Sequence, residues 1–380
     1  MIIKTADRIS SVEEYYFSKK LKEISKLKLE GKAIINLGIG SPDLMPPVSA
    51  IEKLLNSARK SDSHGYQPYQ GTPELKQAIA EFSGRKLNIQ LDQTEILPLL
   101  GSKEGITHIS LAYLNPDDKV LIPSVGYPTY TSVTKLVGAQ PVYFPLVEEN
   151  GWEPNWNFLE EQDDPSIKII WLNYPHMPTG TRGSKELLEK FVKLAKKKEW
   201  LICHDNPYSF ILNENPQSIL SIPGARDVAI ELNSLSKTFN MAGWRVGWIS
   251  GKTEYLNPVL RVKSNMDSGM FKPIQEAACA ALNIDDQWFS NLTQTYKERR
   301  NIVFDILRYL GCQFDEDQSG MFVWAKVPHG DGNEFADEIL DKYEVFVAPG
   351  SIFGEAGKSF IRVSLCSSEE ELKEVMKRMS

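Results

Sequence analysis

A short segment in the second half of the chain surrounds a lysine with groups that bind anions. The lysine is Lys237, and its near neighbours are Ser234, Ser236, Gly243 and Arg245. Two hydroxyl donors and a planar guanidinium fork suit a phosphate group. A lysine amine can also form a covalent bond with a carbonyl compound. A solvent-exposed lysine would have no need of such anion-binding neighbours. The segment therefore predicts a lysine that holds a cofactor beside a phosphate site.

Two further segments carry groups that complement such a site. Asp205 and Tyr208 directly follow the apolar run at residues 200–204, and the glycine-bounded residues 101–105 precede an apolar pattern of helical spacing at 106–113. A helix N-terminus that follows a glycine presents free backbone N–H groups to an anion. Each segment alone is a weak signal, because an aspartate after a strand is commonly a turn or capping residue.

The elements that must position these residues alternate along the middle of the chain. Apolar, β-branched runs at residues 120–123, 168–172, 200–204 and 227–232 predict strands, and residues 184–200 carry apolar side chains at helical spacing. This alternation predicts a mostly parallel sheet covered by helices. Ligands of such sheets bind at the carboxyl ends of the strands. Asp205 and Lys237 both follow a predicted strand and are therefore expected at that edge.

The last third of the chain has a different pattern. Helices are expected at residues 275–282 and 294–310, and strands at 321–325 and 360–365. This order predicts a smaller α+β domain.

Together and in this order, the three segments resemble the class I/II aminotransferases, which are fold-type I pyridoxal 5′-phosphate (PLP) enzymes. The resemblance extends from about residue 35 to residue 362. It implies an α/β fold whose large domain has a mostly parallel seven-stranded sheet sandwiched by helices, beside a smaller α+β domain. The implied division is an N-terminal segment packing with the small domain (1–45), a PLP-binding domain (46–272) and a small C-terminal domain (273–380).

The resemblance also assigns roles around the cofactor. Lys237 would form the internal aldimine with PLP and later move a proton between Cα and C4′. Asp205 would pair with the pyridinium nitrogen, Tyr208 would donate to the phenolic oxygen O3′, and Tyr127 would stack on the ring. The phosphate would be held by the backbone amides of Ser102 and Lys103 and by Ser234, Ser236 and Arg245.

Three more matches concern the substrate and a second subunit. Arg362 matches the arginine that clamps the substrate α-carboxylate in a bidentate fork. Gly40 matches a substrate-side turn of the backbone. Tyr66 matches a tyrosine that reaches the phosphate of the neighbouring subunit, so the resemblance implies a homodimer with shared active sites.

One position departs from the family pattern. The family has Asn-Pro-Thr-Gly after the strand near residue 170, and its asparagine donates to O3′, whereas this chain has Met177 at that place. A thioether cannot donate a hydrogen bond. Losing a donor to a phenolate disfavours the unprotonated aldimine by about 1.5–3 kcal/mol, or roughly one to two pKa units. We therefore expect an internal aldimine that stays protonated to higher pH than usual.

Composition excludes several classes of function. The 380 residues include 43 basic and 50 acidic side chains, a net charge of −7, which argues against a nucleic-acid partner. No run of apolar residues is long enough to span a membrane, and the N-terminus lacks a secretory signal. The four cysteines are scattered without metal-ligand spacing, so reduced thiols in the cytoplasm and no metal site are expected.

The leading hypothesis is an aminotransferase that moves an amino group from an amino acid to a 2-oxo acid by a ping-pong mechanism. The alternative keeps PLP but performs β-lyase chemistry on C–S bonds or other carbanion chemistry. A PLP-sensing regulator is disfavoured because too few residues precede the cofactor-domain pattern. The substrate stays open: Tyr15, Tyr16 and Phe17 either contact its side chain or form a core-packing stripe.

Overall fold

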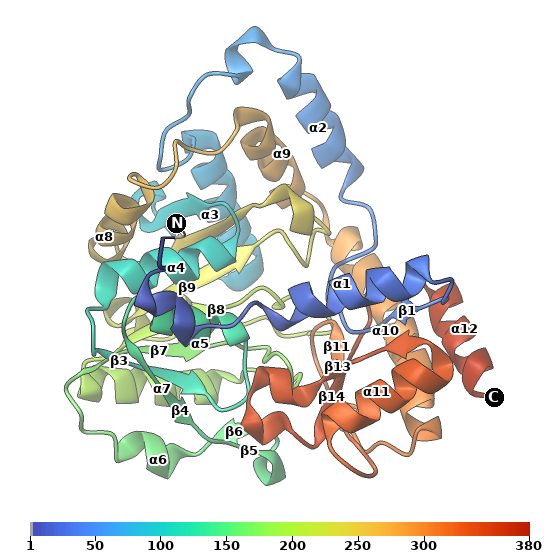
Figure 1. Ribbon diagram of the computed structural model, residues 1–380. Coiled ribbons are helices and arrows are strands. Elements are labelled where there is room, and N and C mark those ends of the chain that lie inside the picture. The colour runs from blue at the N-terminus through green and yellow to red at the C-terminus, as the bar shows by residue number, and fades with distance from the viewer. Residues whose placement is uncertain (1–2) are drawn as a thin grey trace.

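The computed structural model describes residues 3–380, and its larger part is built around one sheet (Figure 1). The strands of this sheet are β2 (Ile96–Leu99), β3 (Lys119–Pro123), β4 (Gln140–Phe144), β7 (Ile167–Leu172), β8 (Leu201–Asp205), β9 (Ala229–Ser234) and β10 (Gly247–Ser250). Their order is β2-β10-β9-β8-β7-β3-β4. β10 runs antiparallel to both neighbours, and the other pairs are parallel. The predicted α/β fold with a mostly parallel seven-stranded sheet is confirmed.

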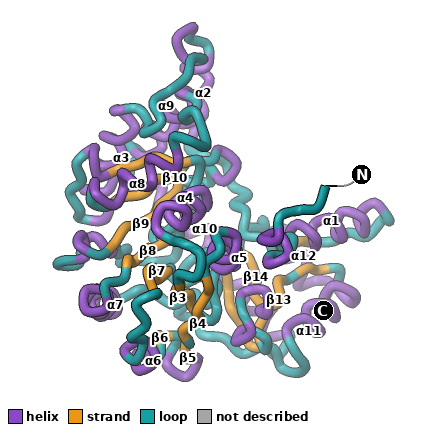
Figure 2. The backbone as a smooth tube through the Cα atoms, turned by 60° about the vertical axis from the view of Figure 1, so that its left-hand side comes forward, coloured by secondary structure: helices purple, strands orange, loops and turns teal. Residues whose placement is uncertain are grey.

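Helices cover both faces of the sheet (Figure 2). They are α2 (Val48–Ala58), α3 (Pro73–Leu87), α4 (Ser102–Tyr113), α5 (Pro128–Leu136), α6 (Trp156–Glu160), α7 (Lys185–Lys198), α8 (Thr253–Lys263) and α9 (Lys272–Leu282). Successive residues of a strand point to opposite faces. Thus Ile169 and Trp171 of β7 pack with α4, α5 and α8, whereas Ile170 and Leu172 pack with α6 and α7. Burial on both faces explains why these strands are almost wholly apolar.

Helix α7 shows how local sequence sets these elements. The side chain of Ser184 accepts a hydrogen bond from the backbone N–H of Leu187 and so caps the helix start. Three lysines occupy the last turn, where the helix dipole favours cations, and Glu199 ends the helix in the left-handed conformation. The segment that the sequence predicts to be helical, residues 184–200, is thus a helix over Lys185–Lys198.

The smaller part lies against one end of the sheet. It contains α10 (Asp286–Tyr309), β11 (Phe322–Lys326), α11 (Gly332–Tyr343), β12 (Val345–Phe346), β13 (Ala348–Pro349), β14 (Phe360–Ser364) and α12 (Glu369–Met379). β14 is the centre of a three-stranded antiparallel sheet between β11 and β13. A short hairpin of β5 (Leu146–Val147) and β6 (Glu153–Pro154) lies apart from both sheets.

The two ends of the chain meet in this smaller part. β1 (Ile35–Asn36) pairs in parallel with β12. α1 (Tyr16–Leu29) is held there because Ile24 and Ile34 share a buried cluster with Leu340 and Phe346. α9 instead packs against α2 and α3 of the larger part. The domain boundaries after residues 45 and 272 stay predictions.

The structure moves several predicted boundaries. Asp205 is the last residue of β8 rather than the first after it, and the strand expected at 227–232 spans Ala229–Ser234. α10 begins at Asp286, eight residues earlier than expected, because its first turns carry mostly polar residues that hide the apolar spacing. Within residues 3–380, no helix has the length and apolar character that crossing a membrane requires.

Candidate active site

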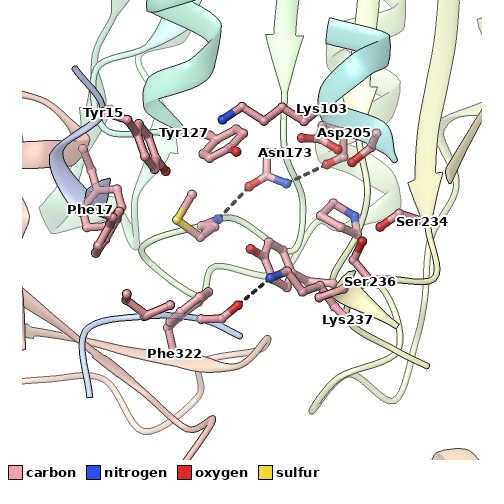
Figure 3. A pocket seen from close by; sticks show the side chains of 18 of the residues that line it. Tyr15, Phe17, Lys103, Tyr127, Asn173, Asp205, Ser234, Ser236, Lys237 and Phe322 are labelled. Carbon is pink, nitrogen blue, oxygen red and sulfur yellow. Dashed lines mark hydrogen bonds between the residues drawn. The ribbon is translucent and has the colours of Figure 1, made fainter. Parts of the chain in front are cut away.

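A cavity of about 680 Å³ lies at the carboxyl ends of β8 and β9 (Figure 3). It is also lined by the start of α4, by residues at the start of α1 and by the smaller part. That volume is typical of sites for small molecules. The predicted site residues that line it are Gly40, Ser102, Lys103, Tyr127, Met177, Asp205, Tyr208, Ser234, Ser236, Lys237, Arg245 and Arg362. Tyr66 does not line it, because its side chain is 92% exposed on a distant loop.

Lys237 lies at the floor of this cavity, three residues after β9 ends. Its Nζ donates a hydrogen bond to the carbonyl oxygen of Gly40 at 2.5 Å. Burial, aided by the nearby guanidinium groups of Arg245 and Arg362, lowers the pKa of the lysine amine below its ordinary value. A larger neutral fraction of the amine makes it a better nucleophile at neutral pH.

Asp205 offers one carboxylate oxygen to a ligand. Its Oδ2 accepts a hydrogen bond from the hydroxyl of Tyr130 at 2.8 Å, whereas Oδ1 is buried without a hydrogen-bond partner among residues 3–380. Burial raises the pKa of Asp205 to about 6, and the Tyr130 hydroxyl opposes that rise. A buried acceptor of this kind is complementary to a cationic ring N–H.

Tyr130 and Asn173 contribute to the site, although neither is predicted from the sequence as a site residue. The ring of Tyr130 stacks on Trp171 with centroids 4.9 Å apart, and Asn173 Nδ2 donates to the Asp205 carbonyl at 2.6 Å (Figure 3). The three-residue spacing of Tyr127 and Tyr130 in the first turn of α5 places both rings on one side of that helix. That spacing is the sequence signal for Tyr130.

The predicted phosphate site is the part of the cavity between the N-terminus of α4 and the side chain of Arg245. Gly101, which precedes α4, has φ +89°, and a Cβ at this position would collide with Arg245 Nη2. The guanidinium is itself fixed, because Nη1 donates to the Ala242 carbonyl at 2.9 Å and Nη2 donates to the Leu100 carbonyl at 3.3 Å. Glycine therefore leaves room for a guanidinium beside the free amides of a helix N-terminus.

Arg362 lies on β14 of the smaller part and lines the cavity. Its Nη2 donates to the Gly38 carbonyl at 2.7 Å, and the guanidinium carbon lies 3.8 Å from the ring centroid of Phe322 and 4.6 Å from that of Phe353. Burial lowers the pKa of Arg362 to about 10, so it remains a cation at neutral pH. Since no carboxylate within residues 3–380 forms an ion pair with it, the guanidinium is available to a carboxylate ligand.

Met177 forms part of the cavity wall beside Arg362. Its Sδ lies 3.2 Å from Arg362 Nη1, and its backbone N–H donates to Asn173 Oδ1 at 2.9 Å. The preceding residue, His176, is buried, and its Nδ1 lies 2.8 Å from the hydroxyl of Thr179. His176 is not among the cavity-lining residues, so its ring is not positioned to replace the missing amide donor.

The remaining aromatic residues frame the cavity. Tyr127 packs edge-on against Tyr130 with centroids 5.6 Å apart. Tyr208 is buried and packs edge-on against Phe322 at 5.9 Å. Both rings therefore have fixed positions around the space that a planar ligand would occupy.

A separate polar group lies along α4, outside this cavity. Ligand atoms of Glu104, His108 and Asp267 lie within 4.8 Å of one another. His108 Nε2 is 3.1 Å from a Glu104 oxygen, and Lys263 forms an ion pair with Asp267. Asp267 thus has an internal partner, whereas both ring nitrogens of His108 are buried without a hydrogen-bond partner among residues 3–380. The expectation that the protein needs no metal stays a prediction.

Comparison with known proteins identifies the family. The family model described as aminotransferase class I and II matches residues 32–379. The chain belongs to the class I and II aminotransferases. It is 37% identical to the LL-diaminopimelate aminotransferase of Halothermothrix orenii, over 99% of this chain and 98% of the relative. It is 39% identical to the corresponding enzyme of Gloeobacter violaceus, with the same coverage.

Solved structures of aminotransferases share the architecture. Substrate-bound BacF from Bacillus subtilis superposes with a TM-score of 0.93 at 34% identity, covering all of this chain and 97% of BacF. A probable N-succinyldiaminopimelate aminotransferase from Thermus thermophilus gives a TM-score of 0.89 at 30% identity, with 96% and 98% covered. The protein is thus a PLP-dependent aminotransferase. The comparisons give no support to the alternative of a β-lyase.

The residues present fit PLP. The unpartnered Asp205 Oδ1 matches a pyridinium N–H, the corner between Gly101 and Arg245 matches a phosphate, and the buried amine of Lys237 matches the aldehyde. When bound, PLP supplies an electron sink for the electrons left at the substrate Cα.

Proposed function

We propose that this aminotransferase uses Lys237 both to hold PLP and to transfer the substrate proton, with Arg362 holding the substrate α-carboxylate. The observation that carries the proposal is the convergence of three groups on one cavity: a buried amine, a buried carboxylate oxygen without a partner, and a guanidinium free of acidic neighbours. Substrates are an amino acid and a 2-oxo acid, taken in alternation.

The other side chains orient the reactants. Asp205 would keep the cofactor ring nitrogen protonated, Tyr208 would donate to its phenolic oxygen, and Tyr127 would pack against the ring. Lys237 then moves a proton to and from the substrate Cα, while closure of the smaller part on the substrate excludes water. The phosphate is gripped by the α4 N-terminus with Ser102, Lys103, Ser234, Ser236 and Arg245.

A covalent mapping experiment tests this role of Lys237. The holoenzyme is reduced with borohydride, digested, and its peptides are analysed by mass spectrometry; the cofactor mass should appear on Lys237 alone. Lys76 is an internal control, because burial also lowers its pKa but it lies outside the cavity. Cofactor mass on another lysine, or on none, would remove the basis of the proposal.

We further propose that the enzyme is a homodimer in which Tyr66 reaches the cofactor phosphate of the partner subunit. Figures 1 and 2 show α2 and the loop after it projecting from the body of the molecule. Large apolar side chains are exposed on this arm and on the neighbouring loop before α9, namely Met45, Val48, Leu55, Tyr66, Tyr69, Met266 and Phe271. Exposed apolar surface of this extent is typical of a protein interface.

Mixing two inactive variants tests the shared site. Tyr66→Ala and Lys237→Ala are each expected to lose most activity. When equal amounts are unfolded and refolded together, about half of the dimers are hybrids with one intact site of two, so roughly a quarter of wild-type activity should return. Absence of any recovery would contradict the sharing of sites.

We also propose that the protein is cytoplasmic. The four cysteines are unpaired, which supports this location.

A further inference from the structure

One end of the cavity lies beyond the groups assigned to the cofactor and the α-carboxylate. Figure 3 shows Tyr15 and Phe17 on the side opposite Asp205 and Ser234. The other lining residues at this end are Ser18, Leu21, Lys22 and Ile39. The start of α1 and the loop after β1 therefore enclose the space into which a substrate side chain would extend.

The surface at this end is largely aromatic and aliphatic. The rings of Tyr15 and Phe17 lie 5.7 Å apart at 52°, and the Phe17 centroid is 5.5 Å from the Arg362 guanidinium carbon. A substrate held by Arg362 thus has Phe17 next to its carboxylate, and the ring of Tyr15 lies beside that of Phe17. Aromatic side chains bury large areas in such an arrangement and prefer tilted contacts of this kind.

The charged groups at this end are the ammonium groups of Lys22 and of Lys103, whose Nζ lies 4.7 Å from the Tyr15 ring centroid, and they do not suit a substrate with a distal ammonium group. Asp205 is the one carboxylate that lines the cavity within residues 3–380, and it lies at the opposite side. Lys22 is already paired with Glu14 at 2.7 Å, and that carboxylate also accepts a hydrogen bond from Ser18 at 2.6 Å. A buried ammonium without an acceptor is strongly disfavoured.

Met177 extends the apolar surface to the carboxylate clamp itself. Its side chain is 5% exposed and lines the cavity where the family has an amide. A thioether packs well against aromatic rings. The wall from Met177 through Phe17 to Tyr15 therefore offers a continuous apolar contact to a bulky side chain.

We propose that the region formed by Tyr15, Phe17, Leu21 and Ile39 is a subsite for aromatic and large aliphatic side chains, so that the preferred amino donors are amino acids such as phenylalanine, tyrosine and leucine. This inference rests on the proposed function. It separates this enzyme from the relatives described as LL-diaminopimelate aminotransferases, because diaminopimelate carries a second ammonium group.

The test is a half-reaction measured with one amino acid at a time. Holoenzyme is mixed with L-phenylalanine, L-leucine, L-glutamate, L-lysine or LL-diaminopimelate, and the loss of visible cofactor absorbance gives a second-order rate constant. Phenylalanine should exceed diaminopimelate and lysine by at least about tenfold. Equal or faster reaction of diaminopimelate, or reaction of glutamate alone, overturns the subsite and leaves the aminotransferase in place. No reaction with any of them overturns the proposed function.

A charge placed in the subsite provides a second readout. Leu21→Glu puts a carboxylate at the cavity, whereas Leu29→Glu puts one on the same helix at a position that is 90% exposed and outside the cavity. The ratio of the phenylalanine to the diaminopimelate rate constant should fall by about tenfold in Leu21→Glu and stay unchanged in Leu29→Glu. A ratio that is unchanged in both variants, or that falls equally in both, contradicts the subsite.

Discussion

Asp205 and Glu231 are both buried carboxylates on neighbouring strands, yet their surroundings differ. Glu231 of β9 has no exposed surface and accepts hydrogen bonds from the Ser218 hydroxyl, the Ile219 backbone N–H and Asn233 Nδ2, and His204 Nδ1 lies 3.0 Å away. Burial alone would raise its pKa, but these bonds outweigh burial, and the pKa is lowered.

Asp205 lies one position further along, paired in register with Leu232 rather than with Glu231. It has one side-chain donor, Tyr130, and its pKa is raised to about 6. Within residues 3–380, Glu231 is thus surrounded by donors of the protein, whereas one oxygen of Asp205 has none. The difference is what we expect if Glu231 stabilises the fold and Asp205 has the ligand-binding role that we propose for it.

The largest expected effect is on stability, from the substitution Glu231→Gln. The amide cannot accept from all of the present donors, and breaking a buried charged network is expected to lower the free energy of unfolding by about 3–5 kcal/mol. Urea denaturation of the apoprotein measures this loss. PLP affinity of the folded variant should be unchanged, and a selective loss of PLP affinity would contradict the contrast.

Asp205→Asn should have the opposite profile. PLP affinity should fall by roughly ten- to hundredfold, because a charge-assisted hydrogen bond contributes about 1.5–3 kcal/mol. The stability of the apoprotein should not fall, since the substitution removes a buried charge without a full set of partners. Titration with PLP and urea denaturation, made on the same preparation, give both values.

The same contrast has a pH signature. Since the pKa of Asp205 is raised to about 6 in the cofactor-free protein, the carboxylate is protonated below that pH, and PLP affinity should decline as the pH falls through about 6. Asp205→Asn cannot titrate and should lack this decline. A decline that persists in the variant would assign it to another group.

Met177 is a third case, in which the wall of the site offers no donor. Met177→Asn restores an amide and should lower the pH midpoint of the visible cofactor absorption of the holoenzyme by about one to two units. A spectrophotometric titration measures the midpoint. An unchanged midpoint would show that the thioether does not set it.

The smallest effect is expected from Tyr130→Phe, which removes one hydroxyl and keeps the ring stacked on Trp171. PLP affinity should fall by about fivefold, corresponding to about 1 kcal/mol for one hydrogen bond. The decline in affinity should also move to higher pH, because Tyr130 holds the pKa of Asp205 down. Tyr113→Phe is the matched control, since it removes a 2.7 Å bond to the Tyr255 carbonyl away from the cavity. A shift in this control as well would make the effect a structural one.

The comparison also shows which features the sequence could predict. Lys237, Asp205 and Arg362 stand in local runs whose residue types indicate a strand end and its chemistry, and the structure brings them to one cavity. The bond between Tyr130 and Asp205 joins residues 75 positions apart. Local spacing does not encode such an approach, because it depends on how α5 packs on the sheet.

The contact between Met177 and Arg362 spans 185 positions and is likewise tertiary. The sequence shows that methionine replaces the family's asparagine at position 177, but it does not show that the thioether contacts Arg362. Strand and helix ends differ from the predicted ones, by up to eight residues at the start of α10, because hydrogen bonding rather than composition decides where an element begins and stops.

The two halves of the site come from different stretches of the chain. The cofactor half is drawn from residues 101–245, whereas the substrate half is drawn from residues 15–40 and 322–362. The join between those ends includes a bond from the Ala33 backbone to Glu344, 311 positions away. During synthesis on the ribosome, β1 therefore cannot pair until β12 has been made. The residues of the cofactor half are all present well before Arg362 is synthesised. With the roles proposed above, the nascent enzyme acquires the residues that bind its coenzyme first and completes those that select a substrate last.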